Sequence, residues 1–249
     1  MTGAQHSRGP RPQDPELFAP AQHERLQAAT SDLSWLLERD YALPSALELV
    51  GNRYGLTVRQ RMAVQRCACT EAQRTEREAR RVDVTQLRGR RLAIDGFNVL
   101  ITLEGALSGG YLFVARDGCV RDVASIHGTY RRVSETDAAI DTVGQALAGW
   151  GVAHAVWYLD QPVSNSGRLR ARILERAALH GWAWTAEVVH NPDRTLVAET
   201  ESVVVSGDSW VIENATCWAN LVGELLRAAG PADSLARAHV ADLSLDERP

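Results

Sequence analysis

Residues 92–101 read LAIDGFNVLI, and this stretch decides how the second half of the chain folds. An apolar run meets Asp95 and Gly96, and the chain then turns apolar again. A carboxylate buried alone is costly unless it is paired or binds a metal. A strand that stops at Asp95 avoids this cost, because the side chain then faces a cleft at the rim of a sheet. We therefore predict a strand near Arg91–Gly96 that ends in a functional residue.

Strand-like and helix-like segments alternate after this point. Alternation of this kind is typical of a parallel sheet with helices on both faces. The predicted strands lie near Arg91–Gly96, Ala155–Leu159, Trp182–Val189 and Ser202–Ser206, and the predicted helices near Thr136–Trp150, Ser166–His180 and Thr216–Ala229. The turn signal Asp117-Gly118 predicts an inserted β-hairpin between Tyr111 and Val133.

The first third of the chain has helical rather than strand character. Leu26 to Leu37 repeats at helical spacing, Ala46–Val50 fits a second helix, and Thr57 is the expected N-cap of a third that runs from Val58 to about Arg80. We expect a disordered leader over residues 1–22, a helical module over 23–85, an α/β domain over 90–230 and a flexible tail over 231–249. The predicted fold class is α/β with a central parallel sheet and an N-terminal all-helical module.

Composition excludes several kinds of chemistry. All 27 basic residues are arginine, so a Walker A lysine, a Schiff-base lysine and a kinase lysine are impossible. The four cysteines lack zinc-site or disulfide-framework spacing, which favours a reducing cytoplasm. The sequence has no apolar run of membrane-spanning length and no secretion signal, so we expect no membrane association. The GxSxG, GxGxxG and HExxH motifs are absent.

Charge is distributed unevenly along the chain. Residues 51–91 hold eleven arginines against four acids, whereas residues 92–249 hold twelve arginines against twenty acids. Such asymmetry is typical of a nucleic-acid contact, and a short helix, a glycine turn and an arginine-bearing helix share the helix-turn-helix outline. A solvated helix face is an equal alternative.

Three aspartates follow predicted strands: Asp95, Asp160 and Asp208. Because the carboxyl ends of parallel strands meet at one edge of a sheet, we expect their side chains to share a site. Carboxylates suit a hard cation such as Mg²⁺ or Mn²⁺, which activates water for phosphodiester attack, and Asn98 is placed to support Asp95. Each aspartate taken singly also fits an ordinary turn or N-cap.

Two helix starts add weaker candidates. Asp137 fits a capping residue in Ser134-Glu135-Thr136-Asp137, and Asp141, one turn later, is a candidate additional metal ligand. In the helix that begins at Ser166, the serine with Arg168, Arg170 and Arg172 is a candidate phosphate-binding group for a nucleic acid. An ordinary N-cap with an arginine-rich solvent face explains the second pattern equally well.

The stretches IDGFNVLI, LDQPVSNSG and VVVSGDSWVIENA together resemble the PIN-like superfamily, in particular its NYN branch, whose first strand ends in an Asp-Gly-aromatic-Asn motif. The resemblance covers roughly residues 90–230. It implies a three-layer, metal-dependent ribonuclease fold with metal-site roles for Asp95, Asp208 and Asp160 and a supporting role for Asn98. The whole chain is also similar to an uncharacterised prokaryotic family.

Two departures from the PIN-like pattern bear on activity. Many relatives carry a second aspartate where this chain has Trp210, and the helical acid of many members has no certain counterpart. The candidates for that acid are Asp137, Asp141 and Glu104. An incomplete acidic cluster binds metal more weakly.

The sequence thus favours a Mg²⁺- or Mn²⁺-dependent endoribonuclease with RNA as its partner. The alternatives are a catalytically degenerate PIN-like protein that binds nucleic acid or regulates, and a hydrolase of small phosphate esters. Homo-oligomer formation stays open.

Overall fold

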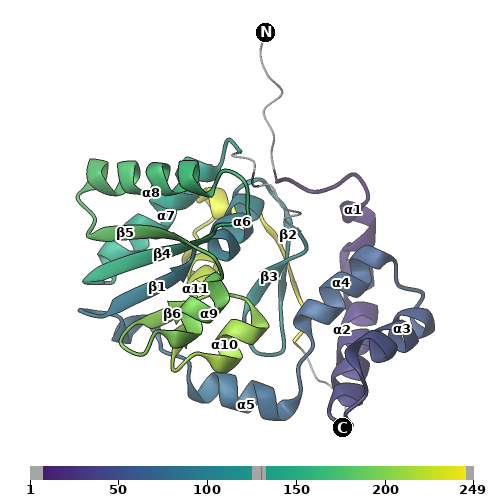
Figure 1. Cartoon of the computed structure of the whole chain (residues 1–249). Coiled ribbons are helices and arrows are strands. Elements are labelled where there is room, and N and C mark those ends of the chain that lie inside the picture. Colours follow the sequence, from purple (N-terminus) through teal and green to yellow (C-terminus); the bar gives the residue numbers. More distant parts are fainter. Residues whose placement is uncertain (1–7, 125–129, 131–132, 245–249) are drawn as a thin grey trace.

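A five-stranded parallel sheet forms the centre of the molecule (Figure 1). The computed structural model describes residues 8–124, 130 and 133–244. In spatial order the strands are β5 (Trp184–Val189), β4 (His154–Asp160), β1 (Arg91–Asp95), β6 (Val203–Val205) and β7 (Trp218–Ala219). The predicted α/β class and its parallel sheet are confirmed.

The strand order changes direction between β1 and β6. From β1 the chain moves outward through β4 to β5, then crosses back to β6 and β7 on the other side of β1. Ligands of open parallel sheets bind at the carboxyl ends of the strands, where the connections leave in opposite directions. In this sheet that point is flanked by the last residue of β1, Asp95, and by the residues that follow β6.

Alternating side chains divide the core between the two faces of the sheet. Leu92 and Ile94 pack on one face with apolar residues of four helices. These helices are α6 (Gly96–Leu107), α7 (Thr136–Gly149), α8 (Ser166–His180) and α11 (Leu221–Ala228). Ala93 packs on the opposite face, under α9 (Pro192–Ala198) and α10 (Ser209–Asn214).

A second sheet joins the middle of the chain to its end. The predicted hairpin is present as β2 (Tyr111–Val114) and β3 (Val120–Asp122), with Gly118 at φ 74° in the turn. The short helix η2 (Ser234–Arg237) leads into β8 (His239–Asp242), which pairs with β2 in parallel. The flexible tail expected over 231–249 is therefore not seen in its described part: β8 pairs with β2, and Ala241 and Leu243 are buried in the core beside it.

The N-terminal helices pack on this second sheet instead of standing apart (Figure 1). Buried residues of the helices, such as Leu33 and Val64, contact Phe113 and Ala241. These helices are α1 (Asp14–Leu17), α2 (Pro20–Leu37), α3 (Leu43–Arg53) and α4 (Val58–Cys67); α5 (Glu71–Ala79) instead lies against α10 and is followed by the 3₁₀ turn η1 (Val84–Gln86). The predicted N-terminal helical region is confirmed, but α1 and the start of α2 lie inside the stretch expected to be a disordered leader.

Several boundaries differ from the predicted ones for local reasons. The helix predicted over Val58 to Arg80 is two helices, because Thr70 forms a second capping box with Gln73 and starts α5. The helix predicted from Thr216 begins only at Leu221, because residues 218–219 pair with β6 as β7. No helix of the described ranges has the length and apolar character needed to cross a membrane.

Three arginines of the segment 51–91 pair with acids that lie outside it. Arg59 binds Asp14, Arg66 binds Asp122, and Arg77 binds both Asp117 and Glu213. Acids elsewhere in the chain thus offset part of the local positive charge of the helices. The helix-turn-helix hypothesis loses support, since α4 packs between α2 and the hairpin.

Candidate active site

Asp95 lies at the junction of β1 and α6, and two donors hold its carboxylate. Its Oδ1 accepts a hydrogen bond from the backbone N–H of Asn98 at 3.3 Å, so Asp95 is the N-cap of α6. Its Oδ2 accepts one from the Ser206 hydroxyl at 2.8 Å, which bridges β1 to the end of β6. The side chain continues the face of Ala93 and points to the side of the sheet that carries α9 and α10.

The residues that follow β6 are fixed against this junction. The side-chain Oδ1 of Asn98 accepts the N–H of Gly207 at 2.7 Å, and the Nε of Arg121 donates to the Gly207 carbonyl at 2.7 Å. A Cβ at Gly207 would lie 3.2 Å from Asn98 Oδ1, so the close approach favours glycine there. Asp208, the next residue, is exposed and caps α10 through the N–H groups of Trp210 and Val211.

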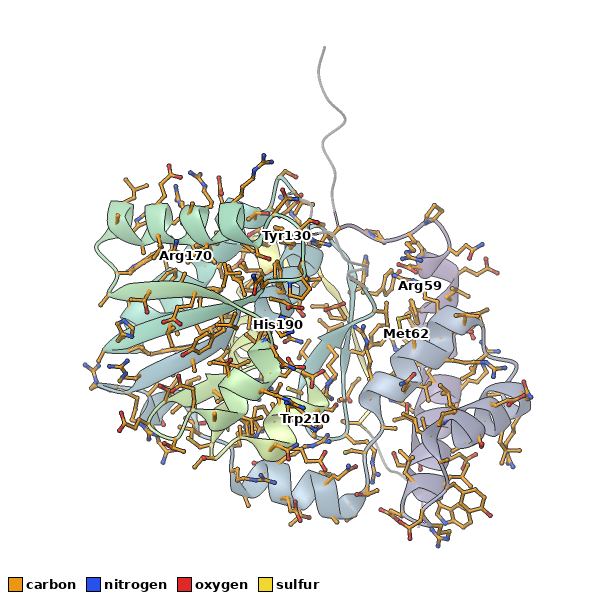
Figure 2. All side chains as sticks on the ribbon, viewed as in Figure 1. Arg59, Met62, Tyr130, Arg170, His190 and Trp210 are labelled. Carbon is orange, nitrogen blue, oxygen red and sulfur yellow. The ribbon has the colours of Figure 1, made fainter. Side chains whose placement is uncertain are left out.

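One cavity of about 370 Å³ collects acidic groups at this edge of the sheet. Its lining includes Asp95 and Phe97 from the β1–α6 junction, Asp160 from the end of β4, and Asp193 and His190 from the segment after β5. Asp208 lies close enough to Asp95 and Asp193 to raise the pKa of each. Figure 2 shows His190 where β5 leads into α9 and Trp210 at the start of α10.

The four carboxylates lack the basic partners that other acids of this chain have. Asp14, Asp117, Asp122, Asp137 and Asp141 are each paired with arginine. Within the described part of the chain, no ion pair reaches any aspartate of the acidic group, namely Asp95, Asp160, Asp193 and Asp208. What sets these four apart is that they face one edge of the sheet together without a basic partner among the described residues.

Burial and repulsion between these acids shift their pKa values upward. Burial raises the pKa of Asp95 to about 7, and the negative charges of Asp193 and Asp208 add to the rise. Burial also raises the pKa of Asp193, with contributions from Asp208 and Asp160. The pKa of Asp160 is raised by burial and partly offset by His190. Perturbed carboxylates that gather in a cleft are typical of functional sites.

The donor chemistry of this group suits a hard divalent cation, but the spacing limits how the cation is held. Over the ranges that the structure describes, no three acidic, histidine or cysteine side chains come together closely enough to form a metal site. Mg²⁺ commonly takes one or two carboxylates and completes its shell with water and substrate phosphate. The acidic group fits that mode, since Asp95, Asp160 and Asp193 line the cavity, and it does not fit a closed protein cage.

Other acids considered from the sequence have structural partners. Asp141 binds Arg176 through both carboxylate oxygens, so its proposed role as a metal ligand is not supported. Asp137 lies in the first turn of α7, where its charge suits the helix start, and it binds Arg172, with Nε to Oδ1 at 2.7 Å. Glu104 is fully buried and binds Arg8, Tyr130 and Thr136.

The arginine-rich helix start is a poor phosphate site. Ser166 is buried, and its hydroxyl donates to the backbone carbonyls of Asp160 and Val163. Arg172 is held by Asp137 and Glu175, and the Nε of Arg170 donates to the Ala186 carbonyl at 2.7 Å. The nucleic-acid-binding role predicted for Ser166 and Arg172 is therefore not supported, because their donors are already used. Arg168 stays exposed on α8, with a long 3.5 Å contact to Asn165.

Asp193 and His190 are site residues that the sequence pattern did not single out. Asp193 follows a strand by four residues and lies in the first turn of α9, which Asn191 caps. The sequence does carry a signal for it: the predicted strand is followed directly by His-Asn-Pro-Asp, a helix start whose aspartate lies at the carboxyl end of that strand. His190 is exposed and lines the acidic cavity.

Comparison with known proteins gives this architecture a family. Residues 84–224, which include the whole acidic group, match the family described as "Domain of unknown function (DUF5616)". The chain belongs to this family. Residues 25–80, the N-terminal helices, match the "Protein of unknown function (DUF434)" family.

A full-length relative has the same arrangement. The chain is 30% identical over 205 residues to "Uncharacterized protein MJ0935" of Methanocaldococcus jannaschii, which covers 81% of this chain and 96% of the relative. The helical region and the α/β region therefore occur together in that relative. No solved structure matches the chain.

Proposed function

We propose that this protein is a Mg²⁺- or Mn²⁺-dependent endoribonuclease that hydrolyses RNA phosphodiesters at the acidic cavity. The observation that carries the proposal is the acidic group itself: four carboxylates without ion-pair partners in the described residues, at the carboxyl edge of a parallel sheet, with Asp95 and Asp208 on either side of its switch point. The DGFN motif at residues 95–98, which underlies the resemblance to the PIN-like superfamily, lies in this group.

The chain's own residues divide into holding and positioning roles. Asp95, with Asp160 beside it, would hold the cation, which when bound supplies charge stabilisation and a more acidic water. Asn98 fixes the Gly207 peptide, and Ser206 donates to Asp95, so both keep the Asp95 and Asp208 carboxylates in place. An RNA phosphate carries the negative charge that a cation at this edge would attract.

Replacing the acids tests the proposal directly. We expect Asp95→Asn and Asp208→Asn to reduce Mg²⁺-dependent cleavage of a labelled RNA by about 100-fold or more, because each removes a charge from the site. Gel analysis of the RNA products, with and without chelator, measures the effect. The folded state should survive, since an asparagine retains an oxygen that can cap α6 or α10.

Asp141→Asn is the matched control. It removes the same charge from a carboxylate that binds Arg176 away from the acidic cavity. This variant should cleave RNA at the wild-type rate. Wild-type activity in Asp95→Asn and Asp208→Asn would refute the proposed site.

A second candidate function is non-catalytic RNA binding or regulation by a degenerate PIN-like domain. Two observations favour it: Trp210 stands where many PIN-like relatives have an acid, and the described residues hold no preformed three-ligand metal site. RNA binding that survives chelator, together with no cleavage in Mg²⁺ or Mn²⁺, would select this function over the nuclease.

A further inference from the structure

A smaller cavity of about 150 Å³ lies beside the acidic cavity, across the first turn of α6. Phe97 lines the acidic cavity, whereas the next residue, Asn98, lines the smaller one. Asp122 of β3, the segment from Gly207 to Ser209 and Arg66 of α4 also line it. We call it the Arg66 cavity. It is built by the hairpin, by the loop that carries Asp208 and by a helix of the N-terminal region.

Arg66 is held in place by the hairpin while part of its guanidinium stays available. Its Nη1 donates to the Asp122 carbonyl at 2.6 Å and to Asp122 Oδ1 at 3.3 Å, and its Nη2 donates to the Ala124 carbonyl at 3.0 Å. Arginine has five N–H donors. Among the described residues, its Nε–H and one Nη2 hydrogen make no hydrogen bond, and the side chain is 35% exposed.

The cavity holds further donors. The oxygen of the Asn98 side chain is taken by the Gly207 N–H, which leaves its amide NH₂ as a donor on the other side of the group. Ser209, Arg121 and Asp208 also line the cavity. The charge of Asp122 is partly satisfied by Thr102, by the Ala124 N–H and by Arg66 itself. A guanidinium edge with amide and hydroxyl donors nearby is the set of groups that binds a phosphate.

We propose that the Arg66 cavity binds a backbone phosphate of the RNA next to the phosphate that is cleaved, with Arg66 as its cationic contact. The inference rests on the proposed function, because the neighbouring acidic cavity defines where the cleaved phosphate lies. Residues 25–80 and 84–224, which match separate families, would then build one substrate site, with Arg66 from the first and Asn98 and Ser209 from the second.

Equilibrium binding tests the contact separately from catalysis. Labelled single-stranded RNA is titrated with the full chain carrying Asp95→Asn, in Mg²⁺, and fluorescence anisotropy is followed at several NaCl concentrations. Adding Arg66→Gln should weaken binding about tenfold and reduce the slope of log Kd against log salt by about one, because one phosphate contact is lost. Arg66→Lys keeps the positive charge but loses the planar guanidinium, so its RNA affinity should lie between that of the Arg66 chain and that of Arg66→Gln.

Two variants separate anion binding from support of the hairpin. Asp122→Asn removes a negative charge from the cavity and keeps an oxygen for the Ala124 N–H, so it should tighten RNA binding about threefold. Arg53→Gln removes an exposed arginine from the same helical region and should leave the affinity unchanged. Melting temperatures check folding, and if Arg66→Gln does not fold, Arg66→Lys and Asp122→Asn decide the outcome.

The possible failures are distinguishable. Unchanged affinity and salt slope in Arg66→Gln, or equal weakening in Asp122→Asn, would overturn the phosphate contact while leaving cleavage by the wild-type chain intact. Arg66-dependent binding without cleavage by the wild-type chain would instead support the contact and refute the nuclease. If no variant and no wild-type chain binds RNA, the phosphate contact is overturned as well.

Discussion

The Asp95 carboxylate makes hydrogen bonds that support the fold, but its burial near other acids destabilises it. It caps α6 and joins β1 to Ser206, yet it is buried beside other negative charges, and its pKa is raised to about 7. A carboxylate whose folded pKa exceeds its unfolded value destabilises the folded state once the pH rises above the unfolded value. Retention of such a residue is typical of a site where function competes with stability.

Asp95→Asn should therefore stabilise the protein near neutral pH. Above pH 7 the wild-type chain must keep a buried charge that asparagine lacks, and we expect a gain on the order of 2 kcal/mol in the free energy of unfolding. The gain should grow as pH rises from about 4 to about 7 and then level off. Over that window Asp95 is ionised in the unfolded chain but still protonated in the folded one. Urea denaturation at a series of pH values measures it.

Asp141→Asn should change stability in the other direction. It removes the partner of Arg176 in a partly exposed pair, so a loss of up to about 1 kcal/mol is expected at pH 7. If Asp95→Asn destabilised the chain equally at every pH, the conclusion that the buried charge of Asp95 destabilises the folded state would be wrong.

Sequence patterns located the residues at strand ends better than those at helix starts. Asp95, Asp160 and Asp208 follow strands whose apolar composition is plain in the sequence, and the structure brings Asp95 and Asp160 to one cavity with Asp208 nearby. Asp193 escaped notice because α9 has only seven residues and no periodic pattern. The partners of Asp137 and Asp141 lie 35 residues away, and such pairings depend on packing of α7 against α8 that no local pattern shows.

At the scale of elements, a network of buried ion pairs joins the β2–β3 hairpin to α5 and to the loop after β6. Asp117 in the hairpin turn binds Arg77 of α5 and Arg121 of β3, with Nη-to-oxygen distances of 2.7 Å in each pair. The two arginines hold the pKa of Asp117 down to about 2, although burial opposes this. Arg121 also donates to the Gly207 carbonyl, so the same chain of contacts reaches the loop that carries Asp208.

Asp117→Asn should be strongly destabilising. It leaves two buried guanidinium groups without their shared carboxylate, and breaking such a pair costs about 3–5 kcal/mol. Chemical denaturation at pH 7 gives the loss. The matched control is Asp137→Asn on α7, which removes a partly exposed partner of Arg172 and should cost less than about 1 kcal/mol. Similar losses of unfolding free energy in both variants would show that the buried ion pairs of Asp117 contribute no more to stability than a partly exposed pair.

Elements were predictable where periodicity was long and uninterrupted. The helices α7 and α8 have nearly the expected bounds, and so do strands β1 and β4. Helix α6 was missed because its sequence, Phe97 to Leu107, is apolar on all sides and buried, which removes the amphipathic signal. β7 and β8 were missed because strands of two and four residues are defined by the neighbour they pair with.

At the scale of the molecule, the two sheets have separate cores that share the hairpin. Leu112 belongs to the core of the α/β region, whereas its neighbour Phe113 packs under the N-terminal helices. The hairpin therefore transmits the position of α4, and with it Arg66, to the edge that carries Asp208. Division into an independent helical module and a catalytic domain does not describe this arrangement, because the helices cover a sheet that the second region supplies.

Removal of β8 tests whether this shared core is needed. A chain that ends at Ala238 loses the strand partner of β2 and the buried side chains of Ala241 and Leu243. We expect a loss of about 3 kcal/mol or more in the free energy of unfolding, because a buried leucine alone contributes 2–5 kcal/mol. A chain that ends at Ser244 keeps these contacts and serves as the control. Because α2 and α4 pack on the same core, the unfolding transition followed by far-ultraviolet circular dichroism, which includes these helices, should move to lower denaturant. Unchanged midpoints in the shorter chain would mean that the helices are held without the C-terminal strand.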